Sequence, residues 1–228
     1  MTKTIGIIGG LGPAATADFF QKLIAATPAR GDSDHLRVLI DSNPRIPDRN
    51  AAIAGRGESP APYLVAAALG LERAGADLLV MACNTAHHWQ DDVRAAVAIP
   101  FLSMIDETAD AAAASGAATI AILAADGARG AQLYERALEQ RGRAWLRLDE
   151  KAQREFMDLI YAVKAGDRSE PIRAAMRAHA HALIASGADA LIAGCTEIPL
   201  VLDAPDVSVP LIESTDVLVR RVIARARA

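Results

Sequence analysis

The chain contains one segment twice, and this duplication restricts the possible fold more than any other feature of the sequence. The first copy covers residues 75–87 and the second covers residues 187–198. Each copy begins with Gly-Ala-Asp, continues as an apolar run, and reaches a cysteine that is followed by small polar residues. Cys83 and Cys195 lie 112 residues apart and are the only two cysteines of the 228-residue chain. The duplication therefore indicates two similar units that each present one thiol.

Two further pairs of segments repeat in the same order. Residues 4–10 resemble residues 119–125, and residues 97–102 resemble residues 207–212. The apolar run at 78–82 is typical of a strand buried on both faces, as in a parallel sheet covered by helices. We therefore expect an α/β fold of two similar lobes related by a pseudo-two-fold, each a mainly parallel sheet flanked by helices, with the active site in the cleft between them.

The expected boundaries follow from the repeats and from turn residues. The first lobe is predicted to comprise residues 1–104 together with 210–228, and the second lobe residues 105–209. The last helix is expected to pack back on the first lobe. Two prolines make residues 42–50 a predicted loop. Strands are predicted at 4–8, 37–41, 78–82, 101–104 and 119–125, and helices at 13–24, 63–74, 86–97, 130–141, 151–165, 170–186 and 216–227.

Composition excludes several classes of function. Hydrophobic residues make up 52% of the chain and charged residues 23%, as in a globular protein with an ample core. The net charge of −4 and the lack of a basic run argue against nucleic acid and anionic membranes as partners. The apolar run near the N-terminus is too short for a signal peptide, so we expect a cytoplasmic protein with reduced cysteines. No CxxC or HxxxH pattern indicates a metal site.

Both cysteines follow an apolar strand and precede an expected helix. Ligands of open parallel sheets bind beyond the carboxyl ends of the strands, so each thiol should lie at the rim of its lobe, facing the other. The alternative is that both are inert core cysteines, since free cysteine is often buried. Core positions do not need polar neighbours, however, and these cysteines are followed by Asn84 and Thr85 in one copy and by Thr196 and Glu197 in the other.

Two matched acid/base groups that face one small ligand suit a symmetric reaction such as racemisation. One thiolate would remove the α-proton of an amino acid, and the opposing thiol would protonate the other face. The carbanion must be stabilised, for which backbone N–H groups after each cysteine, the Asn84 amide and the Thr85 and Thr196 hydroxyls are candidates. The sequence shows no lysine signature for pyridoxal phosphate, and none is needed for this scheme.

The chain resembles the aspartate/glutamate racemase family, the cofactor-independent amino acid racemases, over nearly its whole length. The motifs that carry the resemblance lie at residues 9–16, 43–49, 83–87 and 194–199. The resemblance implies that Cys83 and Cys195 are the two bases, acting on the D and the L enantiomer respectively. It further implies an aspartate or glutamate substrate, no cofactor and a homodimer.

The same resemblance suggests roles for residues around the cysteines. Asn84, Thr85 and Thr196 would hold the α-carboxylate and the amine, and Arg49 would clamp the side-chain carboxylate with Lys164 as its partner. The alternatives are that Arg49 is only solvated and that Lys164 only complements a helix dipole. Glu197 would lie among the substrate-binding residues and orient Cys195 or its neighbours. The alternative is that it only favours the start of a helix.

One turn departs from the family pattern. Residues 124–128 read Ala-Ala-Asp-Gly-Ala, where the family often has Thr-x-Gly-Thr. Asp126, if it points into the cleft, would repel a substrate carboxylate. This leaves open a racemase or isomerase that acts on another small α-acidic substrate.

Two other classes of protein remain as competitors. The pattern at residues 10–15 fits the G-x-G-x-x-A fingerprint of dinucleotide-binding enzymes, but its spacing of 31 residues to Asp41 is long and the repeated cysteines stay unexplained. A two-lobe protein that binds a small molecule without catalysis would also have matched lobes, but it would not need paired thiols.

Overall fold

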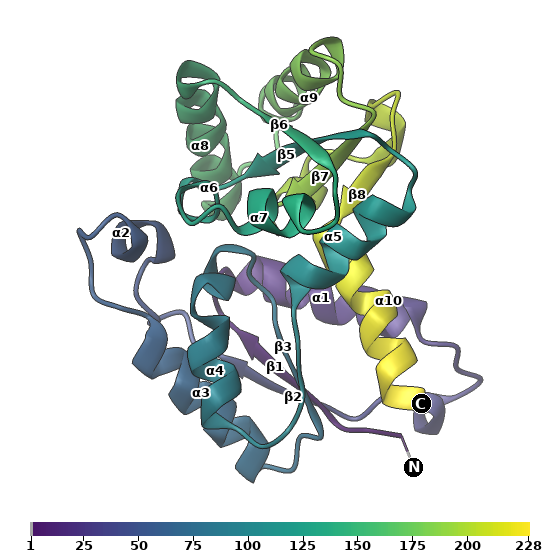
Figure 1. The fold of residues 1–228 in the computed structure, drawn as a ribbon. Coiled ribbons are helices and arrows are strands. Elements are labelled where there is room, and N and C mark those ends of the chain that lie inside the picture. The colour runs from purple at the N-terminus through teal and green to yellow at the C-terminus, as the bar shows by residue number, and fades with distance from the viewer. Residues whose placement is uncertain (1) are drawn as a thin grey trace.

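The computed structural model describes residues 2–228 and contains two lobes, each built on one four-stranded parallel sheet (Figure 1). The first sheet has the order β2-β1-β3-β4, with β1 at Ile5–Gly9, β2 at Val38–Ser42, β3 at Leu78–Met81 and β4 at Phe101–Leu102. The second has the order β6-β5-β7-β8, with β5 at Thr119–Ala124, β6 at Ala144–Arg147, β7 at Ala190–Gly194 and β8 at Leu211–Glu213. The predicted fold class is confirmed.

Helices connect and cover the strands of each sheet. They are α1 (Pro13–Ala26), α2 (Arg49–Ile53), α3 (Ala61–Arg73), α4 (Gln90–Ala96), α5 (Met104–Ala114), α6 (Asp126–Gly130), α7 (Leu133–Glu139), α8 (Glu150–Lys164), α9 (Glu170–Ala185) and α10 (Ser214–Arg227). Short 3₁₀ turns follow the cysteine strands, namely η2 (Thr85–Trp89) and η3 (Ile198–Leu200). Within residues 2–228, no helix is long and apolar enough to cross a membrane.

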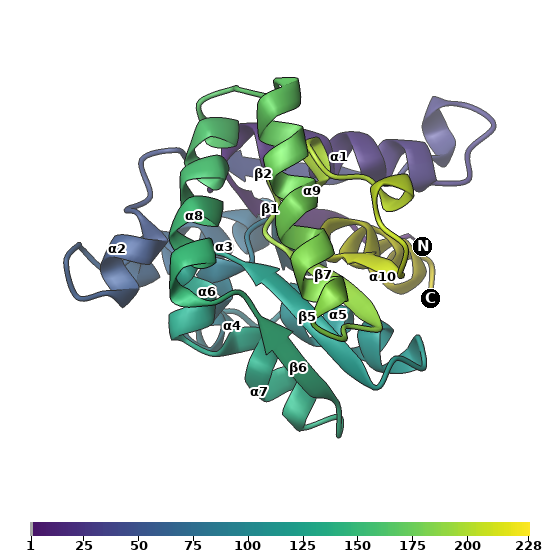
Figure 2. The same cartoon turned by 90° about the horizontal axis from the view of Figure 1, so that it is seen from above.

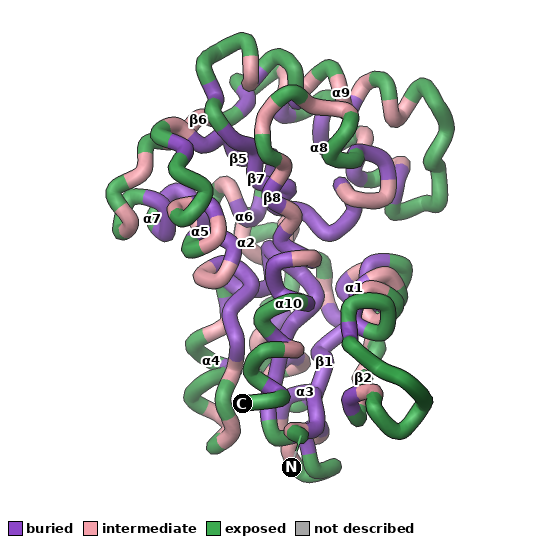
Figure 3. Tube along the Cα trace, turned by 90° about the vertical axis from the view of Figure 1, so that its right-hand side faces the viewer, coloured by how far each residue is buried: buried purple, intermediate pink, exposed green. Residues whose placement is uncertain are grey.

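Both faces of each central strand are buried. In β3, Leu78 and Val80 belong to the hydrophobic cluster under α1 and α10, whereas Leu79 and Met81 belong to the cluster under α3 and α4. This alternation is expected because successive side chains of a strand point to opposite faces. Figure 3 shows the resulting pattern, with buried segments along the sheets of both lobes and exposed segments at the periphery. In Figure 2, α8 and α9 lie side by side over the second sheet.

The lobes exchange their last helices. After β4, α5 leaves the first sheet, and its Ile105 and Ala109 join the core of the second lobe. After β8, α10 leaves the second sheet and packs Leu218 and Val222 against the first sheet (Figure 1). The expectation that the closing helix packs on the first lobe is confirmed. Each lobe is therefore covered by a helix that follows the last strand of the other lobe. The chain crosses between the lobes twice, from β4 into α5 and from β8 into α10.

The structure differs from the predicted elements in several places. Residues 211–213 form β8 and pair with β7 of the second sheet, although the predicted division assigns them to the first lobe. The predicted loop at 42–50 ends in the first turn of α2, because the Asp48 side chain caps that helix by accepting a bond from Ala51 N. The predicted helix at 130–141 is interrupted at Gln132, whose φ of 54° is left-handed. Helix α5 and strand β6 were not expected from the sequence.

The repeated Gly-Ala-Asp has a structural explanation. Gly75 and Gly187 have φ of 93° and 100°, a conformation that favours glycine and ends the preceding helix. Asp77 then accepts a bond from Thr4 N at 2.7 Å, and Asp189 accepts one from Thr119 N at 3.0 Å. Each lobe therefore uses the same aspartate contact to align its cysteine strand with its first strand.

Candidate active site

The two cysteines meet at one cavity between the lobes. Cys83 follows β3 and Cys195 follows β7, at the carboxyl ends of the central strands, where parallel sheets bind ligands. Both are free thiols and each is 7% exposed. All eight residues proposed for the site line this cavity, and Asp48, Asn50 and Ala125 complete it; the eight are Arg49, Cys83, Asn84, Thr85, Lys164, Cys195, Thr196 and Glu197. The structure therefore brings the predicted residues together from both lobes.

The cavity is closed. Its volume of about 20 Å³ accommodates about one water molecule, so a bound amino acid requires the lobes or a covering segment to move apart. The covering segment includes α2 of the first lobe, which contacts α6 of the second. Asn50 of α2 accepts a bond from Gly127 N at 2.8 Å, and its amide lies 3.4 Å from the Tyr161 hydroxyl.

Glu197 lies between a cysteine and a lysine. The Cys195 thiol donates to one carboxylate oxygen of Glu197, with 2.9 Å between sulfur and oxygen. The Lys164 ammonium donates to the other oxygen at 2.8 Å, and the Thr196 hydroxyl lies 3.3 Å from the first. Because Glu197 is only 3% exposed, its ion pair with Lys164 is far less screened by solvent than an ion pair on the surface.

These contacts set the protonation of the second half of the site. Burial, followed by the negative charge of Glu197, raises the pKa of the Cys195 thiol well above its usual range, so this cysteine is protonated at neutral pH. Burial by itself lowers the pKa of Lys164, but the negative charge of Glu197 and its hydrogen bond to the ammonium group oppose this effect and the net direction is upward. Lys164 is therefore an ammonium group, and Cys195 is a thiol bonded to a carboxylate.

Cys83 is held through its backbone. The carbonyl of Cys83 lies 2.8 Å from Nδ1 of His87, and Nε2 of the same ring accepts a bond from Met104 N at 3.0 Å. Met104 begins α5, where the chain crosses to the other lobe. Burial lowers the pKa of His87 to about 4, so the ring is neutral, with its proton on Nδ1. His87 thus connects the cysteine to the crossing between the lobes.

Asn84 binds groups of the other lobe. Its amide donates to the Ser214 hydroxyl at 3.0 Å, Ser214 donates to Ala193 O at 2.9 Å, and the Tyr134 hydroxyl donates to the Asn84 carbonyl oxygen. Tyr134 is fully buried, and burial raises its pKa. Sequence reasoning missed Tyr134 and Ser214, because a tyrosine on an apolar helix face and a serine at a helix start are ordinary.

The guanidinium of Arg49 is largely occupied by backbone carbonyls. It donates to Leu11 O at 2.7 Å, to Pro47 O at 2.9 Å and to Ile46 O at 3.1 Å. These bonds hold the glycine-rich loop against the loop that precedes α2. Arg49 lines the cavity, but most of its donors already have acceptors in the protein.

The glycine-rich loop fits the cysteine site. Gly10 has a φ of 82°, and a side chain there would collide with the Asn43 backbone. A side chain at Gly12 would meet the Glu197 carboxylate at 2.8 Å. The fingerprint that resembled a dinucleotide-binding loop is thus explained by close packing against the site.

Asp126 does not line the cavity. Its carboxylate accepts a bond at 2.8 Å from the amide of Gln153, which is buried, and Ala125 takes the place on the cavity wall. The expected repulsion between Asp126 and a substrate carboxylate is therefore removed. Within residues 2–228, no cluster of His, Cys, Asp and Glu side chains has the geometry to hold a metal ion.

The fold and the site together define a two-lobe α/β protein with a closed interlobe cavity and one thiol from each lobe. The sequence pattern of the Asp/Glu/Hydantoin racemase family matches residues 8–222, and the chain belongs to this family. The resemblance inferred from the sequence motifs is confirmed, as is the prediction of an isomerase.

Individual relatives agree with this assignment. The chain is 25% identical over 224 residues to the broad specificity amino-acid racemase RacX of Bacillus subtilis (strain 168), covering 96% of each chain. The structure of the aspartate racemase of Picrophilus torridus superposes with a TM-score of 0.89 at 32% identity, over 99% of this chain and 94% of that one. An aspartate racemase homologue of Pyrococcus horikoshii OT3 matches with a TM-score of 0.80 at 28% identity, over 99% of this chain and 100% of that one.

Proposed function

We propose that the protein racemises an amino acid without pyridoxal phosphate, by proton transfer between the two thiols. One sulfur, as thiolate, takes the α-proton, and the electron pair of the broken C–H bond delocalises into the α-carboxylate. The other sulfur, as thiol, donates its proton to the opposite face of the same carbon. Each catalytic cycle leaves the proton on the opposite sulfur, and the reverse reaction uses the sulfurs in exchanged roles.

One observation carries the proposal: free thiols from matched positions of two similar lobes line a single closed cavity. A racemase that works with two bases needs an acid and a base on opposite sides of one carbon. The pseudo-two-fold arrangement of the strands that precede Cys83 and Cys195 supports such a pair. Membership of the racemase family supports the same reaction class.

The main energetic demand is the weak acidity of the α-proton. A gap of ten pKa units between this proton and a thiol corresponds to about 14 kcal/mol. The site must lower this gap by stabilising charge on the α-carboxylate. We propose the backbone N–H groups after each cysteine and the hydroxyls of Thr85 and Thr196 as donors. The amide of Asn84 contributes mainly by fixing the turn, since Ser214 and Tyr134 already bind it.

Glu197 has a specific place in this scheme. It accepts the proton of Cys195 in a hydrogen bond and so supports the resting form in which Cys195 is the acid and Cys83 the base. This form is suited to the enantiomer whose α-proton faces Cys83, which the family resemblance assigns as D. To act on the other enantiomer, Cys195 must lose its proton, and Glu197 is positioned to receive it.

Aspartate or glutamate is the proposed substrate. Arg49 and Lys164 are the two cations at the cavity, and a guanidinium can bind a carboxylate with two parallel hydrogen bonds. The activity of the Picrophilus torridus relative, an aspartate racemase, supports this choice.

A second candidate is a neutral amino acid or another small α-acidic molecule. The observation that favours it is that both cations are already engaged, Arg49 by three carbonyls and Lys164 by Glu197. An acidic side chain would have to replace part of these contacts, whereas a neutral one would leave them intact.

A substrate panel separates the two candidates. The purified protein, without added cofactor, is incubated with single L-amino acids, and chiral chromatography measures the D form. Aspartate or glutamate is expected to react fastest, and Arg49→Ala is expected to reduce their kcat/KM more than that of neutral amino acids. Faster reaction of neutral amino acids, with equal losses in Arg49→Ala, would transfer the assignment to the second candidate. Racemisation of none would reject the proposed function.

The homodimer and the cytoplasmic location stay predictions from the sequence. We propose a dimer on the basis of the family resemblance, and sedimentation equilibrium measures it directly, with twice the chain mass of 23.9 kDa expected.

A further inference from the structure

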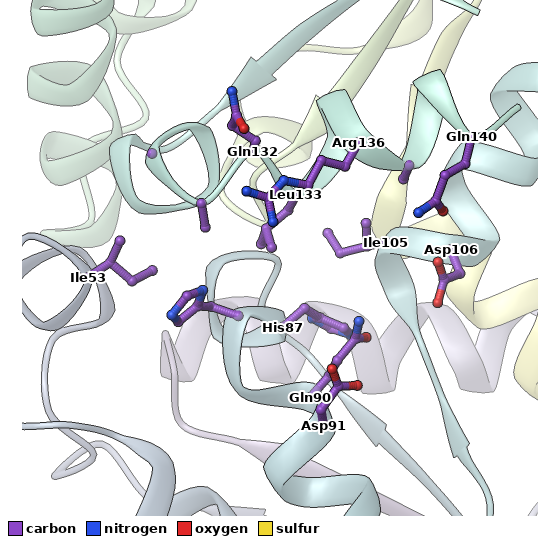
Figure 4. A pocket seen from close by; sticks show the side chains of 14 residues that line it. Ile53, His87, Gln90, Asp91, Ile105, Asp106, Gln132, Leu133, Arg136 and Gln140 are labelled. Atoms are coloured by element: carbon purple, nitrogen blue, oxygen red, sulfur yellow. The ribbon is translucent and has the colours of Figure 1, made fainter. Parts of the chain in front are cut away.

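A second and larger cavity lies between the lobes and borders the same segments as the cysteine site (Figure 4). Its volume is about 660 Å³, within the range of small-molecule sites. Helix α2 gives Arg49 to the cysteine cavity and Ile53 to the second one. The η2 turn likewise gives Thr85 to the first and His88 to the second. A molecule in the second cavity therefore contacts the segments that close the first.

The second cavity has groups of both charges. Arg136 extends from α7 of the second lobe toward its middle in Figure 4, and within residues 2–228 its guanidinium makes no hydrogen bond or ion pair. Asp91 of α4 and Asp106 of α5 also line the cavity, and Arg94 approaches their carboxylates only to 3.4 and 3.5 Å, while Arg141 lies 3.9 Å from Asp106. The cavity thus presents an available cation on α7 of the second lobe and weakly paired anions on α4 of the first lobe and on the α5 crossing.

A neutral group in the same wall lacks a partner. The side-chain oxygen of Gln90 is buried and has no hydrogen bond within residues 2–228. A buried acceptor without a donor is unfavourable by the free energy of its lost hydration, so a rotation of the Gln90 side chain that brings this oxygen to a ligand N–H group in the cavity would be stabilising. Gln90 lies next to Asp91 at the start of α4, where a ligand ammonium or amide group would meet both.

We propose that this second cavity binds a small zwitterion across the two lobes, with its carboxylate on Arg136 and its N–H donors on Gln90 and the nearby aspartates. A free amino acid and a short peptide share this chemistry and differ in the separation of their charges. Such a ligand contacts both lobes in the closed arrangement, so it opposes their separation and makes the cysteine cavity less accessible. The inference rests on the second cavity and does not require the cysteines to be catalytic.

Binding is tested without turnover, by NMR titration with glycylglycine and, separately, with glycine. We expect saturable shifts of the Arg136 side-chain N–H signal and of the His88 ring signals. Arg136→Gln is expected to weaken binding about tenfold or more, because a charge-assisted hydrogen bond is lost. The matched control is Arg154→Gln, which removes an exposed helical arginine from α8, outside the cavity, and is expected to leave the affinity unchanged.

The outcomes are separable. Tighter binding of glycine than of glycylglycine would assign a free amino acid, and the reverse would assign a peptide; both support the site. Shifts confined to Asn84 and Thr85, no shifts, or equal affinities of wild type and Arg136→Gln would overturn it. A protein that fails to racemise can still pass this test, and an active racemase can fail it.

The effect on lobe separation has its own measurement. Alkylation of the cysteines by iodoacetamide requires the closed cavity to open, so saturating glycylglycine is expected to slow alkylation in the wild type. The same concentration is expected to have no effect in Arg136→Gln. An unchanged alkylation rate in the saturated wild type would overturn the proposed coupling between the two cavities.

Discussion

The two halves of the cysteine site share a frame but differ at one decisive position. In each half an aspartate aligns the strand, and the cysteine lies just beyond the carboxyl end of the strand. Two residues after the cysteine, the first half has Thr85 and the second has Glu197. Glu197 binds both Cys195 and Lys164, whereas Cys83 is held through its carbonyl by His87.

This difference shows how a duplicated fold can hold its two thiols in unequal surroundings. The shared frame places the two sulfurs at equivalent positions, as the proposed two-thiol racemisation requires. The unequal neighbours act on Cys195, whose burial and contact with Glu197 keep the thiol protonated. In the proposed mechanism, the geometry of the reaction therefore comes from the repeat, and the protonation of Cys195 from the departure from the repeat.

The largest predicted effect is on the sulfurs themselves. Cys83→Ala and Cys195→Ala are each expected to lower the racemisation rate by about 10³-fold or more, because either change removes an acid/base group from one face. Circular dichroism should show an intact fold in both variants. Normal turnover by either variant would exclude a two-thiol mechanism.

The next largest effect concerns Glu197, which contacts Cys195 and has no counterpart beside Cys83. Glu197→Gln is expected to lower kcat/KM about 10²-fold, and equally in both directions, since enantiomers have the same free energy. Loss of the negative charge also lowers the pKa of Cys195, so its alkylation at neutral pH should become faster relative to that of Cys83. Peptide mapping by mass spectrometry measures this ratio.

The control for that variant is Glu135→Gln. Glu135 is also a buried glutamate of the second lobe, 2% exposed, but it lies outside the cysteine cavity. Its substitution should leave the alkylation ratio unchanged. Equal ratios in the wild type and in Glu197→Gln would mean that Glu197 does not set the protonation of Cys195.

A smaller effect concerns His87, which holds the Cys83 carbonyl in the first half of the site, and it is seen in the free energy of unfolding. The pKa of His87 falls from 6.5 to about 4 on folding, so the unfolded chain binds more protons between these pH values. Stability therefore decreases as pH falls from about 6.5 to 4, by on the order of 3 kcal/mol from this residue. Urea unfolding at pH 7 and pH 4.5 should show a weaker pH dependence in His87→Asn.

The neighbouring His88 provides the matched control. It is exposed, so His88→Asn should keep the pH dependence of the wild type. If both variants behave alike, the neutral state of His87 is not what couples stability to pH.

The smallest effect tests the shared frame. Asp77→Ala and Asp189→Ala each remove one contact between a side chain and a backbone N–H group, so each should reduce the free energy of unfolding by about 1 kcal/mol. Since the contacts are equivalent, the two losses should be similar, and racemisation should persist in both variants. Strongly unequal losses of unfolding free energy would show that the aspartate contact does not stabilise the two lobes to the same extent.

Sequence reasoning predicted the fold well where the pattern was repeated or periodic. The cysteine strands could be predicted because apolar runs and Gly-Ala-Asp are local signals, whereas the return of the last helix to the first lobe was inferred from topology alone. The alanine-rich α5 and the partly exposed strand β6 lack such signals. The break at Gln132 was also not predictable, because a left-handed non-glycine residue depends on tertiary contacts.

The candidate site was predicted as a set of residues but not as a network. Cysteine motifs identify Cys83, Cys195 and their neighbours, yet nothing local shows that Lys164 binds Glu197 or that Arg49 donates to Leu11 O. Asp126 was expected to matter if it faced the cleft, but Gln153, 27 residues away, holds it elsewhere. Contacts between distant segments depend on packing, which a single sequence does not reveal.

The central claim is that the two thiols act from opposite faces of one carbon, and deuterium labelling tests it most directly. The protein is incubated with the L form of its substrate in D₂O and stopped after a small fraction has reacted. The account predicts deuterium at the α-carbon of the D product and almost none in the remaining L substrate, because the removed proton and the delivered deuteron are on different sulfurs. Equal deuterium in both enantiomers, or unlabelled product, would contradict it.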